Sequence, residues 1–193
     1  MSTKFRIAVA AIVTMASIVA FAGANQQKHE VIPPWLDAFG APRIAVNLSF
    51  NGSEVSIGQL LPRNLTVSPP HVSLDVPSSL AGSWLTLVMV DPDARSPTHP
   101  ELALILHWIV VNIATEHESH GDILRSGTDA VAYMGPSPPI GTHRYFVLAF
   151  VQNRFLQIEP ITDRRNFSLR NFTMKYDLHY PFGGTYFRVR AGM

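Results

Sequence analysis

The chain has no cysteine, and only 15% of its 193 residues are Asp, Glu, Lys or Arg. The absence of cysteine excludes a disulfide framework and a cysteine nucleophile. A net charge of +1 without any basic run argues against nucleic-acid binding. Low charge also argues against disorder, and the 15 prolines indicate many turns between short elements. These absences leave an ordinary folded domain.

The N-terminal segment predicts a secretory signal peptide at 1–24. Lys4 and Arg6 precede an uncharged run over 7–22, and small residues fit cleavage after Ala22 or Ala24. A membrane anchor is the alternative, but the run is shorter than the about 20 residues that a spanning helix needs. We therefore expect a secreted, extracellular protein with one mature domain at 25–193 and no transmembrane segment in the mature chain.

Glycosylation triplets support export independently. Five of the eight asparagines begin an Asn-x-Ser/Thr triplet without an intervening proline, where chance would give about one. This excess predicts a glycoprotein whose surface meets the glycosylation machinery. The five asparagines are Asn47, Asn51, Asn64, Asn166 and Asn171.

Hydrophobic patterning predicts a mainly β chain with one sheet or two sheets packed together. Two alternating segments and three nearly continuous apolar runs indicate strands at 44–50, 71–76, 84–90, 104–113 and 143–151. The continuous runs are typical of central strands that are covered on both faces. Short helices are expected at 31–39 and at 163–176, the second with Asp163 as its N-cap.

Two polar positions adjoin these buried strands. The run 84–90 leads directly into Asp91-Pro92-Asp93, where proline restricts the backbone and fixes the direction of the Asp91 side chain. A plain turn, in which the carboxylates bond nearby amides, is the simpler interpretation. His107 interrupts the apolar run 102–111, and a lone histidine there is more often a satisfied core residue than a ligand.

The next strand contributes a second histidine and a phenol. His143 and Tyr145 lie two residues apart and share one face, whereas Arg144 takes the opposite face. The loop 133–142 before them is rich in proline and hinged by Gly135 and Gly141, so that it is stiff and exposes amide donors. Together with the positions on the earlier strands, these groups could line a small concave site.

Such a site suits a phosphate-like anion, because histidine, tyrosine and loop amides all donate hydrogen bonds. Two histidines with one carboxylate also fit a non-haem iron site, but no HExxH motif occurs. His117 and His120 lie in a polar stretch that favours a solvated loop. Covalent catalysis is the weakest interpretation, because no G-x-S-x-G motif is present.

At these positions the sequence closely resembles the phosphatidylethanolamine-binding protein (PEBP) family, which includes the Raf kinase inhibitor proteins. The resemblance covers roughly 31–190. Three motifs carry it: LTLVMVDPDA at 85–94, HWIVVN at 107–112, and YxGPxPPxGxHRY at 133–145. It implies a fold of packed antiparallel β-sheets with a shallow anion pocket for phosphate-bearing head groups. Carried over by position, the ligand-binding residues would be Asp91, His107, Tyr133, Gly135, Pro139, His143 and Tyr145, with Asp93 and Arg144 shaping the pocket wall.

Three departures from the family pattern predict a more open and less selective site. Arg95 stands where many relatives have proline, which would loosen the loop and put a cation beside the pocket. Ala103-Leu104 replaces the Arg-Glu pair that precedes the strand histidine in relatives. The C-terminal helix of animal relatives is expected to be absent.

The expected function is therefore a secreted, non-enzymatic binding protein for phospholipid head groups or other phosphate-like anions, with no cofactor and no metal. Protonation of His107 or His143 should strengthen binding as the pH falls toward about 6. The alternative is a protease inhibitor or an extracellular signalling protein that acts through its surface, with a secreted protease as its partner.

Overall fold

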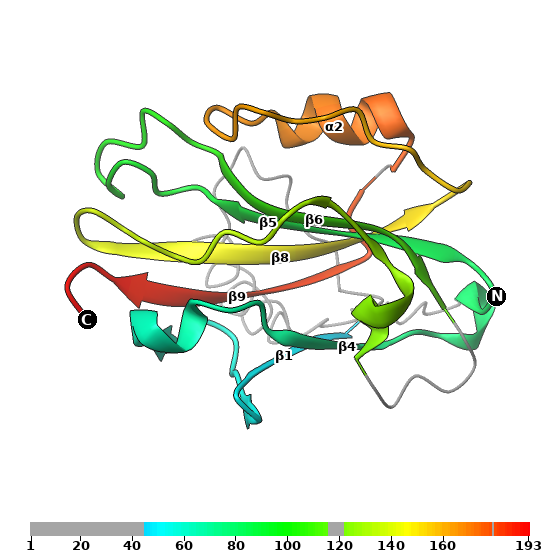
Figure 1. Ribbon diagram of the computed structural model, residues 1–193, viewed down its shortest axis with the longest axis horizontal. Coiled ribbons are helices and arrows are strands. Elements are labelled where there is room, and N and C mark those ends of the chain that lie inside the picture. The colour runs from blue at the N-terminus through cyan, green and yellow to red at the C-terminus, as the bar shows by residue number, and fades with distance from the viewer. Residues whose placement is uncertain (1–44, 116–121, 179) are drawn as a thin grey trace, which may run out of the picture. The chain divides into compact units, whose positions relative to one another are not determined.

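The computed structural model describes residues 45–115, 122–178 and 180–193 (Figure 1). All strands and helices of these ranges fall within one compact unit, Phe39–Met193. The predicted signal peptide, the helix expected at 31–39, and His117 and His120 lie outside the described residues. The division into a leader and one mature domain therefore stays a prediction.

A six-stranded sheet forms the centre of the fold, with the strand order β3-β9-β8-β5-β6-β7. Its strands are β3 (Leu60–Leu61), β5 (Trp84–Asp91), β6 (Ile105–Ala114), β7 (Thr128–Val131), β8 (Thr142–Gln152) and β9 (Gly183–Arg190). Neighbours are antiparallel except β3 and β9, which run parallel. The sheets are therefore antiparallel as expected, apart from this edge, where a strand of only two residues joins β9.

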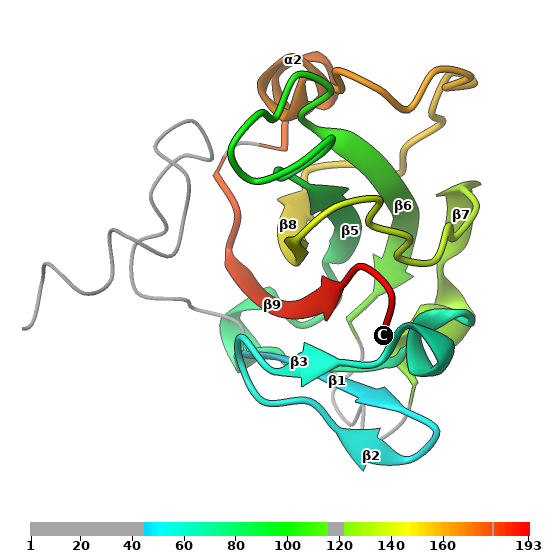
Figure 2. The same cartoon turned by 90° about the vertical axis from the view of Figure 1, so that its left-hand side faces the viewer.

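A smaller antiparallel sheet packs against one face of the large one. It consists of β1 (Ala45–Phe50), β2 (Ser53–Glu54) and β4 (His71–Asp75), in the order β2-β1-β4. The core lies between the two sheets, as Figure 2 shows edge-on, and alternate residues of β1 and β4 enter it from one side. Alternate residues of β5, β8 and β9 enter from the other side. The predicted mainly β fold of two packed sheets is confirmed.

One α-helix, α2 (Leu169–Tyr176), covers the opposite face of the large sheet (Figures 1 and 2). It is shorter than the helix expected at 163–176, and the prediction that Asp163 caps it is wrong. Ser168 is the N-cap, with its hydroxyl accepting from the Asn171 amide at 3.2 Å. Asp163 instead pairs with Arg165 in the loop before the helix.

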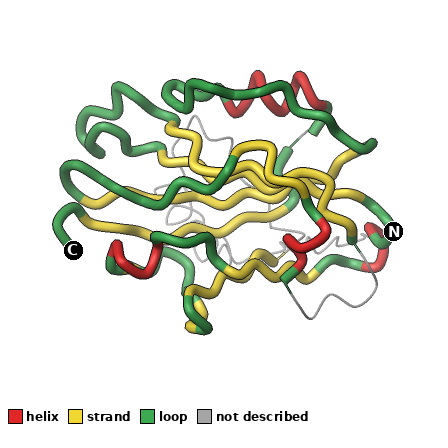
Figure 3. Tube along the Cα trace, viewed as in Figure 1, coloured by secondary structure: helices red, strands yellow, loops and turns green. Residues whose placement is uncertain are grey.

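Strands and loops make up most of the described chain (Figure 3), and three short 3₁₀ helices interrupt the loops. These are η1 (Arg63–Thr66), η2 (Ser78–Leu80) and η3 (Ile123–Ser126). All five predicted strands are present, with bounds that differ by one residue where they differ. Within the described ranges, no helix has the length and apolar character needed to cross a membrane.

Candidate functional site

Two residues that the sequence placed on different strands meet at one end of the large sheet. Asp91 is the last residue of β5, and His143 is the second residue of the neighbouring strand β8. The Asp91 carboxylate lies 2.7 Å from Nδ1 of His143, and both side chains are buried. The same carboxylate accepts from the Asp93 amide at 2.7 Å. The Asp-Pro-Asp turn thus aims Asp91 at the imidazole, as its proline suggests.

The surroundings of His143 fix its charge. Its Nε2 lies 3.1 Å from the carbonyl of Ile140, so both ring nitrogens face oxygens that only accept. Burial lowers the pKa of His143, but the hydrogen bond and charge of Asp91 outweigh it and raise this pKa above its ordinary value. His143 is therefore an imidazolium whose two donors are already used. The Asp91 carboxylate balances its charge, and it has no free donor for a ligand.

His107 joins this group because of a bulge in β6. On β5, Met89 pairs with Trp108 of β6, and the next residue, Val90, pairs with Leu106. His107 lies between those two residues of β6 and has no pairing partner on β5. A bulge of this kind breaks the strict alternation of faces. The His107 ring consequently lies edge-on to Tyr145, with 5.1 Å between ring centroids.

The protonation of His107 is the opposite of that of His143. Its Nδ1 lies 2.6 Å from the Met134 carbonyl and must donate to it. Burial lowers the pKa of His107, more than the Met134 carbonyl and Asp91 raise it, and the charges of Arg164 and His143 lower it further. His107 is therefore neutral at pH 7, with its proton on Nδ1 and a lone pair on Nε2.

Tyr145 lies between the two histidines. Its ring stacks on that of His143 at 6.5 Å and on that of Phe187 at 5.5 Å. The side chain is fully buried, and within the described ranges its hydroxyl is the one buried side-chain group without a hydrogen-bond partner. Burial, then the charges of Asp91 and Asp93 and a weak hydrogen-bond interaction with the Asp91 carboxylate, raise the pKa of Tyr145, so the hydroxyl remains a neutral donor. The hydroxyl is therefore a buried donor that lacks a hydrogen bond of ordinary length and has the Asp91 carboxylate as a neighbour.

Asp93 and Arg144 hold the strand ends together. The Asp93 carboxylate receives Nε and a terminal nitrogen of Arg144 at 2.8 and 2.7 Å, together with the Arg144 amide at 2.9 Å. Arg144 also lies over the ring of Phe146, on the face opposite His143 and Tyr145. These contacts fasten the start of β8 to the turn after β5, and the wall-shaping role of both residues stays a prediction.

The loop 133–141 covers the site and contains three of the predicted ligand-binding residues, each in a different environment. Tyr133 already donates its hydroxyl to the Thr66 carbonyl at 2.9 Å, and its ring packs on Trp108. Gly135 lies so close to Thr66 that a Cβ atom would be 2.8 Å from that carbonyl. Pro139 is exposed. The loop therefore reaches the histidines through the carbonyls of Met134 and Ile140 rather than through these side chains.

Arg164 is a site-supporting residue that the sequence analysis missed. Its guanidinium donates to the carbonyls of His107 and Ala132 at 3.1 and 2.9 Å, which ties β6 to the start of the covering loop. No local pattern marks this role, because Arg164 lies 57 residues after His107. Arg95, the cation expected beside the pocket, is exposed in the turn after β5.

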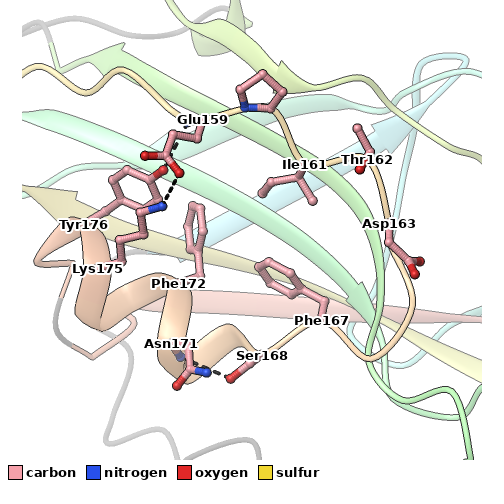
Figure 4. Close-up of a pocket in the computed structure, with 11 residues that line it drawn as sticks. Glu159, Ile161, Thr162, Asp163, Phe167, Ser168, Asn171, Phe172, Lys175 and Tyr176 are labelled. Carbon is pink, nitrogen blue, oxygen red and sulfur yellow. Dashed lines mark hydrogen bonds and ion pairs between the residues drawn. The ribbon is translucent and has the colours of Figure 1, made fainter.

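A separate hollow of about 400 Å³ lies between α2 and the loop before it (Figure 4). Phe167 and Phe172 line it, and Lys175 and Glu159 form an ion pair at its rim. Asn171, one of the glycosylation candidates, also borders it. The sequence analysis did not predict this hollow.

The site gathers imidazoles, a phenol and carboxylates, but its geometry does not resemble a metal centre. No group of three or more metal-ligating side chains is found in the described ranges. The nitrogens of His143 and Nδ1 of His107 are engaged by oxygen acceptors, which leaves Nε2 of His107 as the one ring nitrogen of this pair without a described partner. The arrangement suits an oxygen-rich anion that can accept from Tyr145.

Comparison with known proteins establishes the class to which this fold and site belong. The family model for phosphatidylethanolamine-binding protein matches residues 51–185. The chain belongs to this family, as its three motifs predicted.

Individual relatives agree with this assignment. Protein MOTHER of FT and TFL1 homolog 2 of Oryza sativa subsp. japonica is 35% identical over 160 residues, covering 81% of this chain and 87% of its own. Protein TERMINAL FLOWER 1 of Arabidopsis thaliana is 35% identical over 161 residues, covering 83% of this chain and 86% of its own. These two plant proteins are thus relatives of this chain along most of their length.

Solved structures share the fold. The carboxypeptidase Y inhibitor, in complex with its cognate proteinase, superposes with a TM-score of 0.69 at 21% identity, covering 86% of this chain and 92% of the inhibitor. A phosphatidylethanolamine-binding protein from Plasmodium vivax superposes with a TM-score of 0.64 at 22% identity, covering 85% of this chain and 95% of its own. At these identities the likeness shows the PEBP-like fold and nothing more specific.

Proposed function

We propose that this protein is a secreted, non-enzymatic binding protein for phospholipid head groups or other phosphate-bearing anions. The ligand would sit where β5, β6 and β8 end under the loop 133–141. Asp91, His107, His143 and Tyr145 form the base of this site, and Asp93 and Arg144 hold its wall. The mature chain would carry a net charge of −1, because cleavage removes two basic residues. Anion affinity must therefore come from these local groups.

The observation that carries the proposal is the unpaired hydroxyl of Tyr145. A buried polar group without a partner costs about 1–3 kcal/mol, so it is seldom retained without a reason. A phosphate oxygen would supply a full acceptor in place of the weak interaction with Asp91, and because Asp91 already balances the charge of His143, affinity would rest on this hydrogen bond. No nucleophile is needed for this role, since binding uses donors and charge alone.

Calorimetric titration with phosphoethanolamine tests the proposal. The wild-type protein should bind, and Tyr145→Phe should weaken the affinity by about tenfold or more, because a hydrogen bond to a charged group contributes about 1.5–3 kcal/mol. Tyr180→Phe is the matched control, since that tyrosine is exposed and distant in sequence from the site motifs. Equal affinities of wild type and Tyr145→Phe would remove the site from consideration.

Inhibition of a secreted protease, or signalling through the protein surface, is the alternative function. The fold shared with the carboxypeptidase Y inhibitor does not by itself favour this role. A screen of secreted proteases against wild type and Tyr145→Phe separates the two possibilities. Inhibition that persists in the variant would point to a surface function, whereas loss of phosphoethanolamine binding without any inhibition would support the anion site.

A further inference from the structure

The hydrogen bond of His107 determines what its free nitrogen can do. A carbonyl oxygen only accepts, so the contact of 2.6 Å between Nδ1 and Met134 requires the proton to be on Nδ1. In the neutral ring, Nε2 then carries a lone pair. No described residue donates to Nε2, and the His107 ring lies edge-on to the ring of Tyr145, whose hydroxyl lacks a hydrogen bond of ordinary length. At neutral pH the site therefore presents one donor, the Tyr145 hydroxyl, and one acceptor, Nε2 of His107.

An acceptor conflicts with the proposed ligand. The phosphate of a phosphodiester has oxygens that only accept, so Nε2 and a phosphate oxygen would repel each other. One proton between them removes the repulsion and forms a charge-assisted hydrogen bond. We infer that His107 makes the site bind its anion together with one proton, which moves from solvent to Nε2 as the ligand enters.

Other titratable groups around His107 do not offer this proton. His143 on β8 is already an imidazolium with both nitrogens engaged, and Asp91 on β5 is its partner. The hydroxyls of Tyr133 and Tyr145 keep their own protons, because burial raises their pKa values. Arg164, which contacts the His107 carbonyl, is a permanent cation. His143 can lose its proton as the pH rises, but both its nitrogens are engaged by Asp91 and Ile140, so His107 is the group of this set that can take up a proton when the ligand binds.

The inference rests on the proposed function, because it describes how the same site takes its anion. It adds a property that can be measured separately from binding, namely the uptake of one proton with the ligand. Burial and the neighbouring cations lower the pKa of free His107, so the protein without ligand lacks this proton, and the bound anion must raise the pKa. Affinity should then fall by about tenfold for each pH unit between the lowered pKa of the free protein and the raised pKa of the complex.

Calorimetry with glycerophosphoethanolamine tests the inference, since the phosphate of this diester has no proton of its own. Titrations at about pH 7.5 in two buffers of different ionisation enthalpy count the protons taken up. Wild type should take up about one proton per ligand. His107→Gln should bind without uptake and with a flat pH profile, because its amide supplies a donor that does not titrate. His71→Gln, an exposed histidine of β4, should behave as wild type.

Each result of the titrations bears on the inference, on the proposed function, or on both. Binding by wild type without proton uptake overturns the inference and leaves the proposed function intact, with the ligand ammonium as the donor to Nε2. Uptake that persists in His107→Gln also overturns it, since another group is then titrating. Absence of any binding overturns the function and the inference together. If His107→Gln does not fold, the ¹⁵N signal of Nε2 in wild type must change to that of a protonated ring nitrogen on ligand addition, and an unchanged signal refutes the inference.

Discussion

The hydroxyl of Tyr145 should favour ligand binding but lower the stability of the ligand-free protein. Because it is buried without a partner, Tyr145→Phe should stabilise the ligand-free protein by about 1 kcal/mol while it weakens anion binding. Denaturant unfolding of both proteins measures the difference. Tyr180→Phe, at an exposed position, should change the free energy of unfolding by less than about 0.5 kcal/mol. A clear loss of stability in Tyr145→Phe would mean that the hydroxyl has a partner in the folded chain.

The imidazolium of His143 predicts a pH dependence of stability. Its pKa is raised in the folded protein, so its contribution is fully present below the unfolded value of 6.5 and is lost as the pH rises through the folded pKa. His107 does not interfere above 6.5, because its pKa is lowered and it is neutral in both states. Unfolding free energies should therefore fall as the pH rises above about 6.5 and level off once it passes the raised folded pKa of His143. In His143→Asn the decline should disappear, and a decline that remains in this variant would assign it elsewhere.

Residue chemistry in the sequence predicted part of the site. Alternation along β8 correctly put His143 and Tyr145 on one face, and the Asp91 carboxylate after the Asp-Pro turn pairs with His143. The expectation that protonation of His143 strengthens binding near pH 6 is not supported, because both its nitrogens are occupied by Asp91 and Ile140. Protonation depends on contacts between distant residues, and the pattern of residue types contains no information about them.

Strands explain why the fold was easier to predict than the site. The central strands β5, β6 and β8 consist of long runs of apolar residues, which indicate strands buried on both faces. The bulge that turns His107 toward Tyr145 leaves no such mark, since it depends on the pairing of β6 with β5. Strand β9 does alternate, with buried residues at every second position, but the sequence analysis did not use that signal.

Helix α2 offers a direct test at the level of one element. Ser168 caps the helix, so Ser168→Ala should reduce the free energy of unfolding by about 1 kcal/mol. Asp163 forms an exposed pair with Arg165 away from the helix start, and Asp163→Ala should change it by less than about 0.5 kcal/mol. Thermal or urea unfolding of the two variants measures both effects. The reverse order of effects would restore Asp163 as the cap.

Secretion and glycosylation are predictions about the molecule as a whole. All five predicted glycosylation asparagines are exposed, on β1, in the turn after it, in η1, and before and within α2. Expressed in a eukaryotic secretory cell, the chain should reach the medium with an N-terminus at residue 23 or 25, and a glycosidase should lower its mass. Replacement of all five asparagines by Gln provides the control. An intact N-terminus on a chain that stays in the cell would contradict export.

The central claim is that the ends of β5, β6 and β8 hold a phosphate-bearing anion. A crystal structure of the mature protein with phosphoethanolamine tests it most directly. The predicted result is a phosphate oxygen about 3 Å from the Tyr145 hydroxyl and from Nε2 of His107, with Asp91 and His143 still paired. A phosphate bound in the hollow beside α2, or elsewhere on the surface, with the Tyr145 hydroxyl still unpaired, would contradict the claim.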